Sequence, residues 1–196
     1  MRDEEKKALE ILQNKIKRIN GYNIHIKDKP DLQSEDNSVG IEIVQSVREE
    51  DMKLRSLACE YWTNKANDNS RILRAMKKNG WNDNTIKDLD AGILYYKGDN
   101  NNGGYSLKID LGLLKESVNK KLKKLNGKGY KIFKENQLFV FTEIAGTDEI
   151  FNMIMDELAV IQNDYHLCFT MIYICTVNML YSFDYIKYEM IKYVLK

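Results

Sequence analysis

Proline is almost absent from this chain: Pro30 is the single one among 196 residues. Because proline fixes φ and lacks a backbone donor, one proline marks one turn, and its position is unusually informative. Cysteine is scarce too, and Cys59, Cys168 and Cys175 are widely spaced or lie in apolar segments. An odd number of cysteines without close spacing argues against a disulfide scaffold and against a zinc knuckle.

The chain also lacks an excess of either charge and any long hydrophobic run. Its 30 basic residues nearly cancel 29 acidic ones, which excludes a uniformly basic nucleic-acid binder but leaves room for a local basic patch. The longest apolar stretch, 169–181, is too short and too interrupted to span a bilayer. Residues 1–7 are charged and lead into no apolar segment, so we expect no secretory signal. We therefore expect a cytoplasmic protein with no membrane partner.

Several catalytic motifs are missing as well. The sequence contains no HExxH, nucleophile elbow, P-loop or GxGxxG motif, and the spacing of His25 and His166 does not suit a metal-ligand pair. The C-terminal tyrosines are not interleaved with basic residues in the way that a base-stacking surface requires.

Two acidic residues stand out beside the single proline. Asp31 follows Pro30 directly, and Glu42 lies inside the apolar run 39–44. A carboxylate within a strand-forming run is costly to bury unless another group pairs with it. Two carboxylates at adjacent strand ends can share a divalent cation, which prefers oxygen ligands. The alternative is that Glu42 faces solvent on an edge strand and that Asp31 only belongs to a turn.

The periodicity of apolar residues predicts an α/β fold with a central mixed sheet flanked by helices. The length is that of one domain, 1–196, with a polar loop or insertion around 81–106. A strand, helix, strand succession after residue 138 predicts parallel pairing through a crossover. The expected helices are 3–20, with acidic residues in its first turn, 46–64, 70–79, 111–125, 148–164 and 184–196. The expected strands are 22–27, 31–35, 39–45, 138–143, 169–177 and 180–183.

Lysines gather in one part of the chain. Residues 115–134 contain eight lysines and one acid, Glu116, on and after the helix 111–125. Such a run is commonly a solvated face, but here it is the clearest place for phosphates to bind. We therefore expect Lys120, Lys123 and Lys124 to contact nucleic acid.

The segments Lys29-Pro30-Asp31 and Gly40-Ile41-Glu42-Ile43-Val44 resemble the core of the PD-(D/E)xK nuclease superfamily. In that family the aspartate opens the second core strand and the acidic residue lies on the third. A lysine normally follows two residues later, where this chain has Val44. Gln45 is one position too late, because side chains alternate between the two faces of a strand, and it is kept as a further candidate.

The helix 111–125 and the strand after it resemble bacterial members of the same family in which the lysine has moved to a helix. On that resemblance Lys121 replaces the missing lysine, with Lys124 one turn further on. The family's first helix often supplies another acidic residue, for which Glu10 is the candidate.

The resemblance implies a restriction-endonuclease-like core of the order αβββαβ and a metal-dependent nuclease that acts on nucleic acid, with DNA as the expected substrate. Asp31, Glu42 and the backbone carbonyl of Ile43 would bind Mg²⁺ or Mn²⁺, and Lys121 would orient water or the phosphate. The alternative, supported by Val44, is a non-catalytic module that binds nucleic acid or protein on the same fold. A purely structural interaction domain and a homodimer also stay open.

Overall fold

The computed structural model describes residues 3–47, 49–63, 69–90 and 107–195. Its contacts divide the chain into two compact units. Met1–Ser46 and Asp110–Lys196 form the first, which we call the sheet unit, and Val47–Ile109 form the second, which we call the helical unit. Along the chain, the helical unit is thus inserted into the sheet unit, whereas the sequence predicts a single domain, 1–196.

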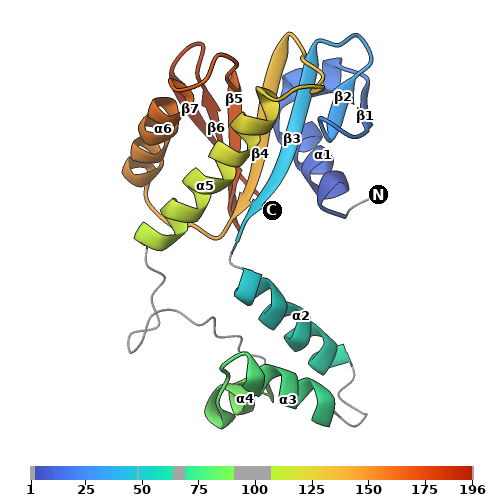
Figure 1. Ribbon diagram of the computed structural model, residues 1–196, viewed down its shortest axis with the longest axis vertical. Helices are drawn as coiled ribbons and strands as arrows, with labels where there is room; N and C mark the ends of the chain where they lie inside the picture. Colours follow the sequence, from blue (N-terminus) through green and yellow to red (C-terminus); the bar gives the residue numbers. More distant parts are fainter. Residues whose placement is uncertain (1–2, 48, 64–68, 91–106, 196) are drawn as a thin grey trace. The chain divides into compact units, whose positions relative to one another are not determined.

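The sheet unit contains a mixed sheet in which seven described strands lie in sequence order (Figure 1). β3 pairs in parallel with β4, and β4 pairs in parallel with β5, while all other neighbours are antiparallel. The predicted α/β class and the predicted parallel crossover are therefore confirmed. The strands are β1 (Ile24–Ile26), β2 (Leu32–Ser34), β3 (Val39–Ser46), β4 (Glu135–Thr142), β5 (Met171–Cys175), β6 (Met179–Asp184) and β7 (Glu189–Val194).

Helices cover both faces of this sheet, as the ribbon shows (Figure 1). On one face lie α1 (Asp3–Lys15) and the short 3-10 helix η1 (Lys17–Gly21), and on the other lie α5 (Leu107–Leu125) and α6 (Asp148–Gln162). α1 packs Ala8 and Leu12 against Ile41 and Ile43 of β3. On α5 the predicted apolar stripe is fully or almost fully buried, at Leu114, Val118, Leu122 and Leu125.

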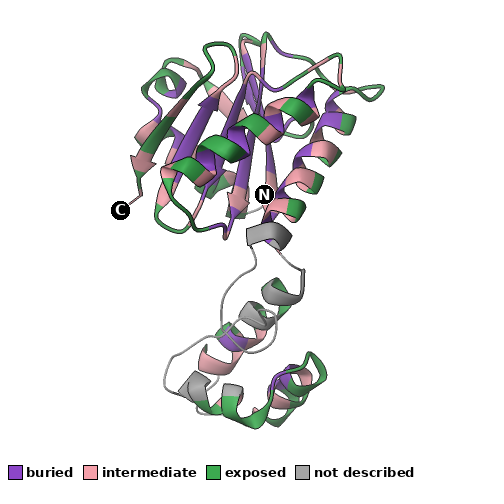
Figure 2. Cartoon of the chain, turned by 90° about the vertical axis from the view of Figure 1, so that its left-hand side faces the viewer, coloured by how far each residue is buried: buried purple, intermediate pink, exposed green. Residues whose placement is uncertain are grey.

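The central strands are buried on both sides, which explains their almost continuous apolar sequence (Figure 2). Successive side chains of β3 point to opposite faces. Ile41 and Ile43 therefore face α1, and Gly40, Glu42 and Val44 face the side of α5. This alternation decides which helix each polar side chain of β3 can reach.

The helical unit contains α2 (Glu49–Thr63), α3 (Ser70–Lys78) and α4 (Asp83–Asp90). Its core is formed by Ala58, Ile72, Met76 and Trp81. α2 and α3 were predicted, but α4 falls in a segment predicted to be irregular. That prediction was wrong for 83–90, and the Asn- and Gly-rich part of the expected loop, 99–104, lies outside the described residues.

The C-terminal segment 184–196 was predicted to be helical, and this prediction was wrong. The segment turns back after β6 and adds β7 to the sheet edge. Asp184 Oδ1 accepts the backbone N–H groups of Ile186 and Lys187, and Tyr188 has φ 57, so the chain reverses. Tyr193 then packs on the core, so tertiary contacts outweigh local helix propensity. No described helix is long and apolar enough to cross a bilayer.

Candidate functional site

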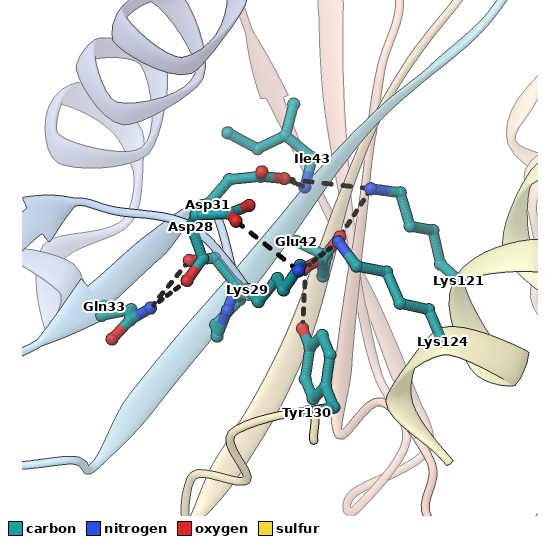
Figure 3. A network of polar contacts seen from close by, with 10 residues as sticks. Asp28, Lys29, Asp31, Gln33, Glu42, Ile43, Lys121, Lys124 and Tyr130 are labelled. Carbon is teal, nitrogen blue, oxygen red and sulfur yellow. Dashed lines mark hydrogen bonds and ion pairs between the residues drawn. The ribbon is translucent and has the colours of Figure 1, made fainter. Parts of the chain in front are cut away.

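Glu42 lies on β3 with a side chain that is 0% exposed, and three donors surround its carboxylate (Figure 3). Lys121 Nζ lies 2.5 Å from Oε2, and Lys124 Nζ lies 2.9 Å from Oε1 and 3.0 Å from Oε2. The hydroxyl of Tyr130 donates to Oε1 at 2.9 Å. The buried carboxylate is therefore paired, as its burial requires, and the solvent-facing alternative for Glu42 is wrong.

Asp31 immediately precedes β2, where Leu32 pairs with Ile41 of the antiparallel neighbour β3. Continuing this register places Asp31 opposite Glu42, and cross-strand partners share one face of a sheet. Asp31 Oδ2 accepts the backbone N–H of Ile43 at 2.7 Å and lies 3.9 Å from Lys121 Nζ. One ammonium group, that of Lys121, therefore lies within 4 Å of both carboxylates.

The turn before Asp31 is held by Gln33, which is buried on β2. Its amide Nε2 donates to the backbone carbonyls of Asp28 at 3.1 Å and Pro30 at 3.0 Å (Figure 3). Lys131 Nζ in turn lies 3.3 Å from Gln33 Oε1. These contacts fix the backbone from which the Asp31 side chain extends.

The two carboxyl groups are shifted in opposite directions. Burial, followed by the charge of Glu42, raises the pKa of Asp31 despite the hydrogen bond from Ile43 and the nearby lysines. Burial would also raise the pKa of Glu42, but its ion pairs with Lys121 and Lys124 outweigh that effect and lower it. Burial and the charge of Glu42 raise the pKa of Tyr130, which therefore stays protonated and donates. Carboxyl pairs with divided pKa values are typical of acid–base and metal sites.

Lys121 and Lys124 reach Glu42 because they flank the buried stripe of α5. Leu122 and Leu125 hold the helix against the sheet, which brings the neighbouring Lys121 and Lys124 over the α5 side of β3. The side chain of Lys121 is 18% exposed and that of Lys124 is 36% exposed. The buried carboxylate of Glu42 is therefore paired with lysines of a helix and not with a lysine of its own strand.

A cavity of about 320 Å³ opens beside these groups. Its lining includes Asp31, Val44 and Lys121, together with Glu4 and Glu5 from the first turn of α1. The sequence indicates an acidic first turn for this helix, whereas the predicted metal-site candidate was Glu10, later in the same helix. Only the packing of α1 on β3 shows which turn lies at the strand end.

Other candidate residues lie apart from the carboxylates. Glu10 is exposed and does not line the cavity. Gln45 lines the cavity but donates to Glu4 Oε1 at 2.9 Å. Lys120 and Lys123 are exposed on α5, and Lys120 pairs with Glu116 at 2.8 Å.

The donor chemistry of the site fits a hard cation with a partly aqueous shell. Asp31 and Glu42 supply carboxylate oxygens. The N–H of Ile43 points toward Asp31, and a strand residue directs its N–H and C=O to the same side. Among the described residues no group of three or more His, Cys, Asp or Glu side chains could hold a metal. A small oxygen-ligand set suits Mg²⁺ or Mn²⁺, since Mg²⁺ keeps several waters, and does not suit Zn²⁺.

Comparison of the chain with protein-family models, with curated proteins and with solved structures finds no match. The function must therefore be argued from the geometry of the site.

Proposed function

We propose that this chain is a metal-dependent nuclease of the PD-(D/E)xK type on a restriction-endonuclease-like core, with DNA as its substrate. The observation that carries the proposal is the position of Lys121 Nζ, 2.5 Å from Glu42 Oε2 and 3.9 Å from Asp31 Oδ2. Asp31, Glu42 and Lys121 come from three separate segments and meet on one face of the sheet. Asp31 and Lys121 line the cavity, and Glu42 contacts Lys121. Once the inserted helical unit with α2, α3 and α4 is set aside, the order α1, η1, β1, β2, β3, α5, β4 supports the fold assignment.

Asp31, Glu42 and the carbonyl of Ile43 would hold Mg²⁺ or Mn²⁺. When bound, such an ion lowers the pKa of its water and neutralises charge on a phosphate. Lys121 supplies a second positive charge next to both carboxylates, where it orients the attacking water and compensates the charge that develops on the phosphate. The water oxygen bonds to phosphorus and gives up one proton, the bond from phosphorus to the leaving sugar oxygen breaks, and that oxygen takes up one proton, so the protons balance.

Lys124 and Tyr130 act through Glu42. Tyr130 contacts Oε1 at 2.9 Å, and Lys124 contacts Oε1 at 2.9 Å and Oε2 at 3.0 Å, so both oxygens of the carboxylate are held in place. Lys121 contacts Oε2 and also lies 3.9 Å from Asp31 Oδ2, so it is the lysine that links the two carboxylates. Val44 contributes an apolar wall to the cavity and needs no charge of its own in this arrangement.

The proposal is tested by cleavage of single- and double-stranded DNA and RNA with Mg²⁺ or Mn²⁺. Lys121→Ala and Asp31→Asn should each lower the rate at least about 100-fold, because one preorganised electrostatic contact is typically worth that much. Lys187→Ala, an exposed lysine in the β6–β7 turn, is the matched control and should retain the wild-type rate. Loss only in Asp31→Asn would keep the nuclease but remove Lys121 from its mechanism.

A non-catalytic module that binds nucleic acid is the second candidate. Its specific support is charge balance, because the carboxylates of Asp31 and Glu42 already face the two ammonium groups of Lys121 and Lys124. Under this reading the wild type cleaves no substrate with either metal. It still binds nucleic acid, and Lys120→Ala with Lys123→Ala reduces the salt dependence of that binding.

A further inference from the structure

α3 and α4 of the helical unit are joined by the short turn 79–82. Within it, Gly80 has φ 91, a left-handed conformation that glycine adopts without the steric cost of a Cβ atom. Two short helices joined by a three- or four-residue turn that contains glycine are typical of a helix-turn-helix. The feature lies entirely within one compact unit.

The turn is fixed by its own buried side chain. Trp81 is 5% exposed and packs with Ala58 of α2 and with Ile72 and Met76 of α3. Ile86 of α4 packs against the same cluster. The three helices therefore share one core, and the outer side chains of α3 and α4 have defined positions.

α3 carries four exposed basic residues and no acidic one: Arg71, Arg74, Lys77 and Lys78. Arg71 pairs with Glu60, and Lys77 pairs with Asp83 at 2.6 Å across the turn. Among the carboxylates of the described residues, none pairs with Arg74 or Lys78. These two cations are therefore available for phosphates, in a chain whose net charge is only +1.

The first turn of α4 presents short polar side chains. Asn82, Asp83 and Asn84 are exposed, and Lys87 follows Asn84 by three residues, on the same side of the helix. The negative charge of Asp83 is compensated by Lys77. Asparagine can form two hydrogen bonds with the major-groove edge of adenine, so this turn carries side chains of the kind that recognise DNA bases.

We infer that the helical unit is a double-stranded DNA-binding module in which α3 contacts phosphates and the first turn of α4 enters the major groove. This is a second nucleic-acid site, separate from the carboxylates and independent of metal. It goes beyond the proposed nuclease and does not require it. If both hold, the chain carries its target-recognition module between the strand that bears Glu42 and the helix that bears Lys121.

The test measures binding of the full chain to a labelled 30-base-pair duplex by fluorescence anisotropy in EDTA, from 50 to 200 mM KCl. Arg74→Ala with Lys78→Ala should reduce the slope of log K against log salt by about 1.8, because each phosphate contact contributes about 0.9. Lys17→Ala with Lys187→Ala removes the same charge from exposed positions of the sheet unit and should leave the slope unchanged. Arg74→Gln and Lys78→Gln, as single variants, should each reduce it by about 0.9.

Asn84→Ala separates base readout from phosphate contact. It should leave the salt slope unchanged while relaxing the sequence preference that the wild type shows in enrichment from a random duplex pool. Both tryptophans, Trp62 and Trp81, lie in the helical unit, so their fluorescence reports whether each variant keeps this unit folded.

Three results would overturn the inference: no duplex binding by the wild type, a preference for single strands, or an unchanged slope in folded Arg74 and Lys78 variants. Because these measurements contain no divalent metal, they fail or succeed independently of cleavage.

Discussion

Glu42 shows at the scale of one residue how a buried carboxylate is maintained. Its side chain is fully buried, and the energetic cost of removing it from water is offset by two lysines and a tyrosine hydroxyl. Glu42→Gln leaves Lys121 and Lys124 without their partner. Because both lysines retain some exposure, we expect a loss of about 2–4 kcal/mol in the free energy of unfolding, at the lower side of buried-pair deletions.

Urea unfolding at pH 7 measures this loss, with Glu116→Gln as the control. Glu116 forms an exposed pair with Lys120, so its substitution should leave stability unchanged. The pKa of Glu42 is lowered from its ordinary 4.5, so its contribution is complete above that pH and disappears as pH falls through the lowered value. A difference between wild type and Glu42→Gln that persists in strong acid would contradict the ion-pair explanation.

Asp31 should behave in the opposite way. Its pKa is raised above its ordinary 3.8, so the folded chain binds more protons than the unfolded chain just above that pH, and charged Asp31 lowers stability at neutral pH. Asp31→Asn removes the charge and keeps an oxygen that can accept the N–H of Ile43. We expect an equal or higher melting temperature at pH 7, an advantage that shrinks toward pH 3.8, and loss of Mn²⁺ binding by calorimetry.

A lower melting temperature together with intact Mn²⁺ binding would instead make Asp31 a structural turn residue. The position of Asp31 at the start of β2 could be anticipated from Pro30 and the strand that follows. The opposing pKa shifts could not, because they depend on how α5 brings two lysines into hydrogen-bond contact with Glu42, while Asp31 lies 3.9 Å from Lys121.

At the scale of the element, β3 joins the fold to the site at Gly40. A Cβ atom there would lie 2.5 Å from Phe133 Cδ2 and 2.8 Å from Pro30 Cγ. Gly40→Ala must therefore displace Phe133 and the residue that precedes Asp31. We expect a loss of about 1–3 kcal/mol in unfolding free energy, as for other overpacked cores, and weaker Mn²⁺ binding.

Gly112→Ala is the matched control, because nothing lies within 4 Å of the added atom on the exposed side of α5. It should stabilise the protein by about 0.5–1 kcal/mol, since alanine is the better helix former. Equal effects of the two substitutions would show that the contact with Phe133 and Pro30 relaxes freely.

Elements with strong periodicity were predictable. The spacing of the leucines predicts the helix α5, and the alternation of side chains predicts the strand β3. The helical pattern between β4 and β5 predicts their crossover, and the α/β class follows from these three predictions. β7 and α4 were missed for different reasons. β7 is fixed by pairing with β6, a non-local contact, and α4 is a short polar helix in which Ile86, together with the preceding Trp81, contacts the core.

The candidate site was predictable only in part. Lys121 was suggested by a resemblance, and its distance from Glu42 could not be derived from local sequence. Tyr130 and the first turn of α1 needed the packing of separate elements. A sequence reveals which residue types are available, whereas the tertiary structure decides which of them meet.

In the whole molecule, each of the two units is proposed to bind its own ligand. Metal would bind the sheet unit, and duplex DNA would bind the helical unit. Both tryptophans report on the helical unit alone, while the signal of the β-sheet in far-ultraviolet circular dichroism reports on the sheet unit. Among the described residues, the core cluster of the helical unit is also the smaller one, which predicts that it unfolds at the lower temperature.

Thermal unfolding followed by both signals should therefore give two transitions that ligands move separately. Mn²⁺ at 100 times its Kd should stabilise the sheet unit by about 2.7 kcal/mol and leave the tryptophan transition in place, because a ligand stabilises only the folded state that binds it. A DNA duplex in EDTA should raise the tryptophan transition instead. Coincident transitions that shift together with either ligand would mean that the two units unfold as one cooperative body, and that binding at one site is coupled energetically to the other.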